Sequence, residues 1–148
     1  MSGSSSAGSA TNDWIKDATR HLENLARDFR DAQNQRNFSI SSPIWTENLS
    51  AGFTSQPEFT THTRIGIEQY LLETKAIFEA YPDMRVDIDE VNTIVDHKTA
   101  KASVYMNLTT SEWPPGMLRR SIGILEFEFT EQKWLCVGYK GFTGMGEE

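Results

Sequence analysis

The sequence predicts a single α+β domain in which three N-terminal helices pack on an antiparallel sheet. Two observations lead to this fold class: apolar residues recur at helical spacing before Pro82, and four β-rich segments separated by turn residues follow it. The chain has 148 residues, which is about the length of one domain. A hydrophobic content of 38% leaves no room for a membrane span of ~20 apolar residues.

The first predicted helix covers about residues 13–35, with Asn12 or Asp13 as its N-cap. Its apolar positions are Trp14, Ile15, Ala18, Leu22, Leu25, Ala26, Phe29 and Ala32. The preceding segment is rich in Ser, Gly and Ala, and it has neither an apolar core nor a basic start. We therefore expect a flexible tail over residues 1–11 rather than a secretory signal, a folded domain over residues 12–148, and a cytoplasmic protein.

Two further helices and a loop are expected before the sheet. Pro43 favours a short second helix over Ile44–Leu49, and the glycine and proline of residues 50–63 predict a loop or a small hairpin. Thr63 is a plausible cap for the third helix, whose apolar stripe is Ile67, Tyr70, Leu71, Ile77, Phe78 and Tyr81. Pro82 ends this helix because proline lacks an amide proton and disfavours the helical conformation of the residue before it.

Four strands are predicted after the third helix. Each is a β-rich segment bounded by turn residues, and the four cover 85–95, 100–110, 118–129 and 134–142. In the second of them the apolar alternate set, which contains Met106 and Leu108, is expected to face the helices, with Tyr105 outside; the reverse assignment remains open. In the third, Arg119 and Ser121 share a face with Phe127.

The helix stop Ala80-Tyr81-Pro82-Asp83, followed by an antiparallel sheet, resembles the SnoaL-like polyketide cyclases of the nuclear-transport-factor-two-like superfamily. The resemblance covers about residues 13–142. It implies a cone-shaped α+β barrel, in which the helices and a curved sheet enclose one deep pocket. The family's "Gly-Thr-His" and late aspartate are replaced by Asn107-Leu108-Thr109-Thr110 and Tyr139-Lys140-Gly141-Phe142, so its usual catalytic pair is not matched.

Three residues are candidates for catalysis. His62 precedes the third helix, in a segment that borders the pocket mouth in SnoaL-like proteins, and imidazole moves protons near neutral pH; a purely local loop role is the alternative. Arg119 could hold an oxygen on which negative charge develops. Asp89 is a weaker candidate, because its acidic run also fits a solvated strand edge.

The candidate substrate-binding residues are those expected to line an apolar cone. Aromatic side chains before and after the third helix usually serve core or lid packing, and they also suit a pocket for a flat or polycyclic ligand. The full set is Trp45, Phe53, Tyr105, Met106, Leu108, Ser121 and Phe127.

The residues present do not indicate a cofactor. No phosphate-binding glycine loop, metal-ligand spacing or Ser-His-Asp order occurs in the sequence, so we expect no metal and no bound cofactor. The formal net charge of −7 argues against nucleic acid as a partner. Cys136 lies in an apolar run, which favours a buried, unreactive thiol.

Three classes of function remain. The first is a cofactor-independent cyclase, isomerase or dehydratase that moves protons on a hydrophobic polyketide- or terpenoid-like metabolite. The second is a non-catalytic small-molecule-binding module, and the third is a dimerisation module. Ile122 and Ile124, with Tyr105, form an apolar set opposite the presumed core, which predicts a homodimer through the outer sheet face.

Overall fold

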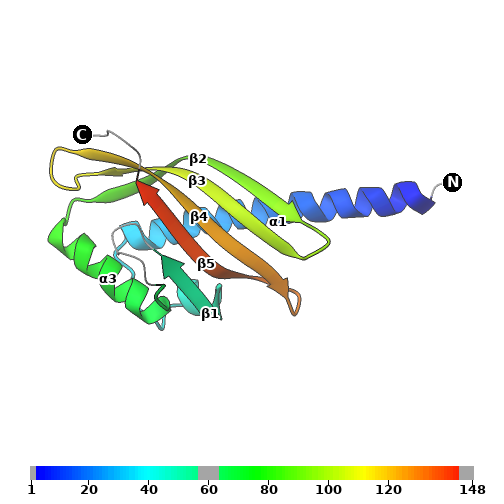
Figure 1. Ribbon diagram of the computed structural model, residues 1–148, viewed down its shortest axis with the longest axis horizontal. Helices are drawn as coiled ribbons and strands as arrows, with labels where there is room; N and C mark the ends of the chain where they lie inside the picture. The colour runs from blue at the N-terminus through cyan, green and yellow to red at the C-terminus, as the bar shows by residue number, and fades with distance from the viewer. Residues whose placement is uncertain (1–2, 57–63, 144–148) are drawn as a thin grey trace.

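The computed structural model describes residues 3–56 and 64–143, which form helices packed on one curved sheet. Five strands lie in the order β1-β5-β4-β3-β2. Figure 1 shows helix α1 crossing one face of this sheet, with its N-terminal part extending past the sheet edge, and helix α3 beside the other end of α1. The elements are α1 (Gly3–Asn34), α2 (Pro43–Thr46), β1 (Leu49–Gln56), α3 (Ile67–Ala80), β2 (Arg85–Asp96), β3 (Lys101–Ser111), β4 (Leu118–Thr130) and β5 (Lys133–Thr143).

The predicted fold class is confirmed. The four strands after Pro82 lie within a few residues of their expected bounds, and α3 ends at Ala80 with Tyr81 as its C-cap. Helix α1 begins at Gly3 rather than near residue 13, so it runs through the segment for which the sequence predicts a tail. Helix α3 begins at Ile67 with Gly66 as N-cap, while the predicted cap, Thr63, lies outside the described residues.

The predicted loop over residues 50–63 is wrong in its first half. Residues Leu49–Gln56 form β1, which pairs parallel with β5 and makes the sheet mixed rather than antiparallel. The alternation of inward and outward residues along β1 is hard to recognise in the sequence. Its two buried inward residues are Phe53, which is large and apolar, and Ser55, which is small and polar. The second helix ends early, at Thr46, because the chain turns into this strand.

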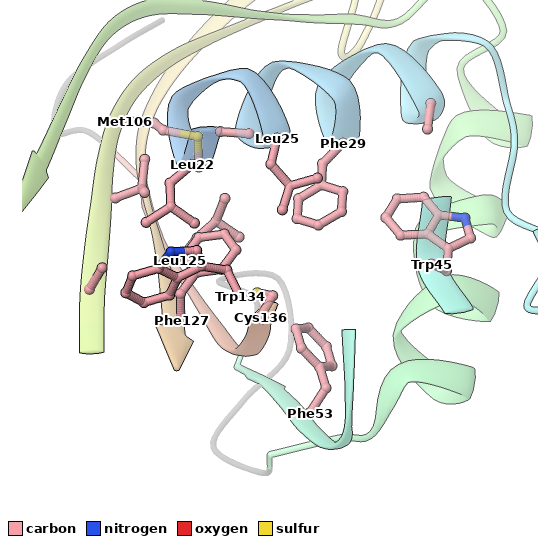
Figure 2. Packing of buried hydrophobic residues seen from close by; sticks show 14 of the residues in the cluster. Leu22, Leu25, Phe29, Trp45, Phe53, Met106, Leu125, Phe127, Trp134 and Cys136 are labelled. Atoms are coloured by element: carbon pink, nitrogen blue, oxygen red, sulfur yellow. The ribbon is translucent and has the colours of Figure 1, made fainter. Parts of the chain in front are cut away.

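The core lies between the buried stripe of α1 and the inward faces of β3, β4 and β5 (Figure 2). The stripe comprises Ala18, Leu22, Leu25, Ala26, Phe29 and Ala32. Opposite it, Val104 and Phe127 are almost inaccessible, at 0% and 1% exposure. Burial of each large apolar side chain stabilises the fold by ~1.5–3 kcal/mol, so this one helical stripe fixes α1 on the sheet.

Two strands contain a bulge that changes which residues face the core. In β5 the register shifts between Cys136, paired with Phe127, and Gly138, paired with Glu126. Because Val137 is the extra residue, Cys136 and Tyr139 both face inward. In β2 the register shifts at Asp89, between Ile88 and Glu90.

A polar clamp joins the end of α1 to the start of β2. The Asn34 side chain donates to the Val86 carbonyl at 2.8 Å and accepts from the Val86 amide at 2.9 Å. The Arg36 guanidinium donates to the carbonyls of Pro82 and Met84 at 2.6 and 2.8 Å and lies 4.8 Å from the centre of the Phe78 ring. The clamp therefore fixes the ends of α1 and α3 against β2. Val86 and Phe78, which the clamp contacts, also line a cavity between the helices and the sheet.

Candidate ligand-binding site

Two adjoining cavities lie between the helices and the inward face of the sheet. We call them the apolar lobe, of about 70 Å³, and the polar lobe, of about 100 Å³. One water needs roughly 10–15 Å³ on the same measure, so each lobe has room for several waters or for part of a ligand. Five residues line both lobes and so form the neck between them: Gln33, Tyr70, Val86, Leu108 and Tyr139.

The apolar lobe is walled by α1, α2, β1 and the centre of the sheet. The Phe29 and Trp45 rings stack with centroids 5.5 Å apart, and Phe53 enters from β1 (Figure 2). The Trp45 indole N–H donates to the Asn37 carbonyl at 3.0 Å, so its polar atom needs no partner in the lobe. The lobe is lined, besides the neck, by Ala26, Phe29, Arg30, Trp45, Leu49, Phe53, Ile88, Met106, Leu125 and Cys136.

The polar lobe carries hydroxyl groups among its apolar walls. Thr74 and Thr110 are buried, at 6% and 7% exposure, and Ser121 lies beside them in the lining. The Thr74 hydroxyl has no hydrogen-bond partner among the described residues. A buried hydroxyl without a partner costs about 1–3 kcal/mol, which is the kind of cost that folds accept at a binding site. The lobe is lined, besides the neck, by Thr74, Ile77, Phe78, Met84, Thr110, Trp113 and Ser121.

Tyr70 stands in the neck with its phenol held from α1. The Gln33 amide donates to the phenol oxygen at 2.9 Å. Burial raises the pKa of Tyr70 above its ordinary value of 10.0; the hydrogen bond from Gln33 and the nearby Thr74 hydroxyl lower it by less. The phenol is therefore neutral at physiological pH, and because its oxygen accepts from Gln33, its own proton is free to point elsewhere.

The ionisable groups around the lobes have little capacity for acid–base chemistry. Among the described residues, no carboxylate and no histidine lines either lobe. Burial raises the pKa of the Cys136 thiol to about 12, so it remains protonated and unreactive. Arg30 lines the apolar lobe but pairs with Asp31 at 2.7 Å.

Five of the predicted site residues line the lobes. Four of them, Trp45, Phe53, Met106 and Leu108, line the apolar lobe, and Leu108 also lines the polar one. Ser121 lines the polar lobe. The second and third predicted strands supply Met106, Leu108 and Ser121. Their inward direction could be predicted because β3 and β4 pair without a register shift, so the alternation of side chains holds along their length.

Arg119 faces inward but lies outside the lining of both lobes. Its Nε donates to the Trp113 carbonyl at 2.8 Å, and its guanidinium lies 4.5 Å from the centre of the Trp113 ring. Trp113 itself lines the polar lobe. Trp113 therefore holds the Arg119 guanidinium next to the polar lobe and lies between the two.

Three further predicted site residues, like Arg119, do not line the lobes. His62 lies outside the described residues. Asp89 is exposed at the β2 bulge, where it accepts a hydrogen bond from Thr109. Tyr105 is 38% exposed on the outer face of β3, opposite Ile124. Phe127 is 1% exposed in the core and has no surface on either lobe.

Sequence reasoning missed the two tyrosines and the threonine around the neck. Tyr70 lies in the apolar stripe of α3, and Thr74 follows it by one helical turn, so this pair could have been found from spacing alone. Tyr139 could not, because its inward direction depends on the bulge at Val137.

The fold matches solved structures closely, although the sequence does not. Comparison with protein-family models and with curated proteins finds no match. An NTF2-like protein of Pseudomonas putida KT2440 has a TM-score of 0.70 at 9% identity, over 86% of this chain and 87% of its own. An NTF2-like protein with a cystatin-like fold from Novosphingobium aromaticivorans reaches 0.71 at 12% identity, over 93% of this chain and 89% of its own.

A third similar structure is the association domain of C. elegans CaMKII, with a TM-score of 0.62 at 16% identity, over 90% of this chain and 98% of that domain. At these identities the likeness concerns the fold, and the chain has the NTF2-like α+β fold. The SnoaL-like family within that superfamily stays a prediction. Within the described residues, no helix is long and apolar enough to cross a membrane.

Proposed function

We propose that the two lobes form a site for a small, largely apolar, oxygenated molecule, in the range of polyketide- or terpenoid-like metabolites. The observation that carries this proposal is an aromatic, apolar lobe joined to a lobe that presents the buried Thr74 hydroxyl, which has no hydrogen-bond partner among the described residues. Pockets of this kind hold a ligand by apolar contact and orient it with a few polar groups.

A panel of such metabolites tests the proposal by their effect on the melting temperature. A ligand present at a hundred times its Kd stabilises the folded state by about 2.7 kcal/mol, which is readily measured. Leu108→Trp, which fills the neck, should abolish the shift. Leu118→Trp on the exposed face of β4 is the matched control and should leave it intact. If no compound shifts the wild-type protein, the site has been misread.

We propose further that the chemistry on this ligand is a cofactor-independent proton transfer, as in a SnoaL-like cyclase, isomerase or dehydratase. Two features support this: the Tyr70 phenol is a neutral donor oriented by Gln33, and Arg119 is held beside the polar lobe. His62 is the proton carrier that the sequence offers. Arg119 can reach a ligand oxygen only after leaving the Trp113 carbonyl.

The enzymatic proposal is tested on the first ligand found. His62→Ala should lower turnover roughly 100- to 10,000-fold while ligand binding is kept. Tyr70→Phe, which removes only the phenol oxygen, should lower turnover as well. Binding without turnover in the wild-type protein would favour the non-catalytic binding module.

The association module is a second candidate because of the outer sheet face. Five apolar side chains lie there on neighbouring strands, four of them at least 38% exposed: Ile94, Tyr105, Ile122, Ile124 and Phe142. Exposed apolar patches of this kind mark interfaces, and the similar CaMKII structure is an association domain. We propose a homodimer through this face. Sedimentation should show a dimer that Ile122→Lys converts to a monomer and that Leu72→Lys, on exposed α3, leaves unchanged.

A further inference from the structure

We infer that the polar lobe selects a neutral hydrogen-bonding head group, a ketone or an alcohol, and rejects a carboxylate or an amine on the same skeleton. This inference rests on the proposed function, because it specifies the chemistry of the ligand's polar end. It follows from which polar groups line the polar lobe and which are engaged elsewhere.

The lining of the polar lobe is polar without being charged. Among the described residues, its polar side chains are hydroxyls, phenols, an amide and an indole, with no acid and no base. A charged head group that moves from water into this lobe would lose its hydration and find no opposite charge to pair with. The free energy of that desolvation opposes binding. Arg119 does not supply that charge, because it lies outside the lining and is engaged with the carbonyl and the ring of Trp113.

Thr74 supplies a hydrogen bond that no described residue uses. Threonine hydroxyls inside a helix commonly donate to the carbonyl four residues earlier, yet Thr74 makes no such bond to the Tyr70 carbonyl. Its hydroxyl lies near the Tyr70 phenol and lowers the pKa of Tyr70, but it has no full hydrogen bond to a described residue. Its oxygen is buried and the residue lines the lobe. A ligand carbonyl or hydroxyl placed there gives it the missing partner.

Tyr70 reinforces the same preference from the neck. Its oxygen already accepts from Gln33, so the phenol acts toward a ligand as a donor. Two neutral donors, from Thr74 and Tyr70, match the two lone pairs of one ketone oxygen. An ammonium group could donate to a hydroxyl oxygen, but among the described lining residues it would find no negative charge to pair with.

Three naphthalene probes test the selection by calorimetry at pH 7: naphthalene, its 2-acetyl ketone and its 2-carboxylate. The expected result is that the ketone binds at least tenfold more tightly than the hydrocarbon, and the carboxylate at least tenfold more weakly than the ketone. A carboxylate that binds as tightly as the ketone would overturn the inference.

Thr74→Val connects the selection to the residue, since valine keeps the shape and removes the hydroxyl. We expect the ketone to lose most of its advantage in this variant while naphthalene binds as before. Ser55→Ala is the matched control: the Ser55 hydroxyl is also buried and without a partner among the described residues, but it lies on β1 outside both lobes. The control should keep the full ketone preference.

The outcomes separate this inference from the proposed function. If naphthalene binds but the ketone has no advantage, or if Thr74→Val keeps that advantage, the inference fails and the apolar site stands. If none of the three probes binds the wild-type protein, both fail.

Discussion

Gly123 of β4 and Gly141 of β5 are cross-strand partners on neighbouring strands, and the Tyr139 side chain lies over both. A Cβ atom on Gly123 would stand 3.1 Å from Cε1 of Tyr139, and one on Gly141 would stand 3.0 Å from its phenol oxygen. The ring therefore occupies the space that two side chains would take. In this position it forms one wall of the neck between the lobes.

Gly123→Ala should destabilise the protein by about 1–3 kcal/mol, because the new methyl group overpacks a filled site. It would meet the Leu108 and Met106 side chains at 3.1 Å as well as Tyr139. Urea unfolding measures the change. Gly52→Ala is the control, since its nearest contact is the Ser50 oxygen at 3.9 Å, and it should change stability by less than about 0.5 kcal/mol. Equal effects of the two substitutions would contradict the packing described for Tyr139.

Thr74→Val should raise the free energy of unfolding of the ligand-free protein by about 1 kcal/mol, because it removes a buried hydroxyl that has no described partner. Thr93→Val is the same chemical change with the opposite expected sign. The Thr93 hydroxyl donates to Glu23 of α1 at 3.0 Å, so its removal should cost about 1–2 kcal/mol. Thermal or urea unfolding of both variants decides; a loss of stability in Thr74→Val would mean that its hydroxyl is satisfied.

Asn34→Ala should lower the free energy of unfolding by about 2 kcal/mol. The substitution removes two hydrogen bonds and leaves the amide and carbonyl of Val86 without their partner. Asn92→Ala on the exposed face of β2 provides the comparison and should be near neutral. If both variants unfold at the same urea concentration, the two hydrogen bonds of Asn34 contribute nothing to stability.

Stability should fall as the pH rises above 9, and Cys136 should account for part of the fall. Burial raises the pKa of this thiol from 9.0 to about 12, so between these values the folded protein keeps a proton that the unfolded chain has lost. The stabilisation is complete below pH 9 and decreases by about 1.4 kcal/mol per pH unit from pH 9 toward pH 12. The raised pKa of Tyr70 acts in the same direction above pH 10.

Cys136→Ala isolates the contribution of the thiol below pH 10, because Tyr70, whose pKa the thiol also raises, titrates above that range. The difference in unfolding free energy between wild type and variant should be constant below pH 8.5 and shrink between pH 9 and 10. A constant difference across the whole range would show that the thiol titrates normally in the folded state.

Most of the fold could be predicted because its strands keep simple alternation. The set Ala102, Val104 and Met106 is apolar and inward, and β3 and β4 stay in register along their whole pairing, so Leu108 and Ser121 could be placed in advance. Strand β1 escaped prediction because Ser55 takes an inward position that pattern reading reserves for large apolar residues.

The candidate site was less accessible to prediction than the fold. Its neck depends on Tyr139, and the one-residue bulge that turns this side chain inward leaves no mark in the sequence Cys136-Val137-Gly138. Asp89 and Tyr105 have side chains that could transfer protons, but they lie on the outer face of the sheet. The type of a side chain does not indicate which face of the sheet it lies on.

The parallel pairing of β1 with β5 constrains the order in which the strands of the sheet can form during folding. Strands β2 to β5 pair with neighbours in the sequence, whereas β1 has β5 as its partner in the described sheet, close to the other end of the chain. Contacts between such distant segments form late, because a long loop must close first. Phe53 and Leu49, which line the apolar lobe, arrive with β1. A nascent chain therefore has no finished cavity until β5 has left the ribosome, and a truncation within β5 should abolish ligand capture even where the rest of the sheet forms.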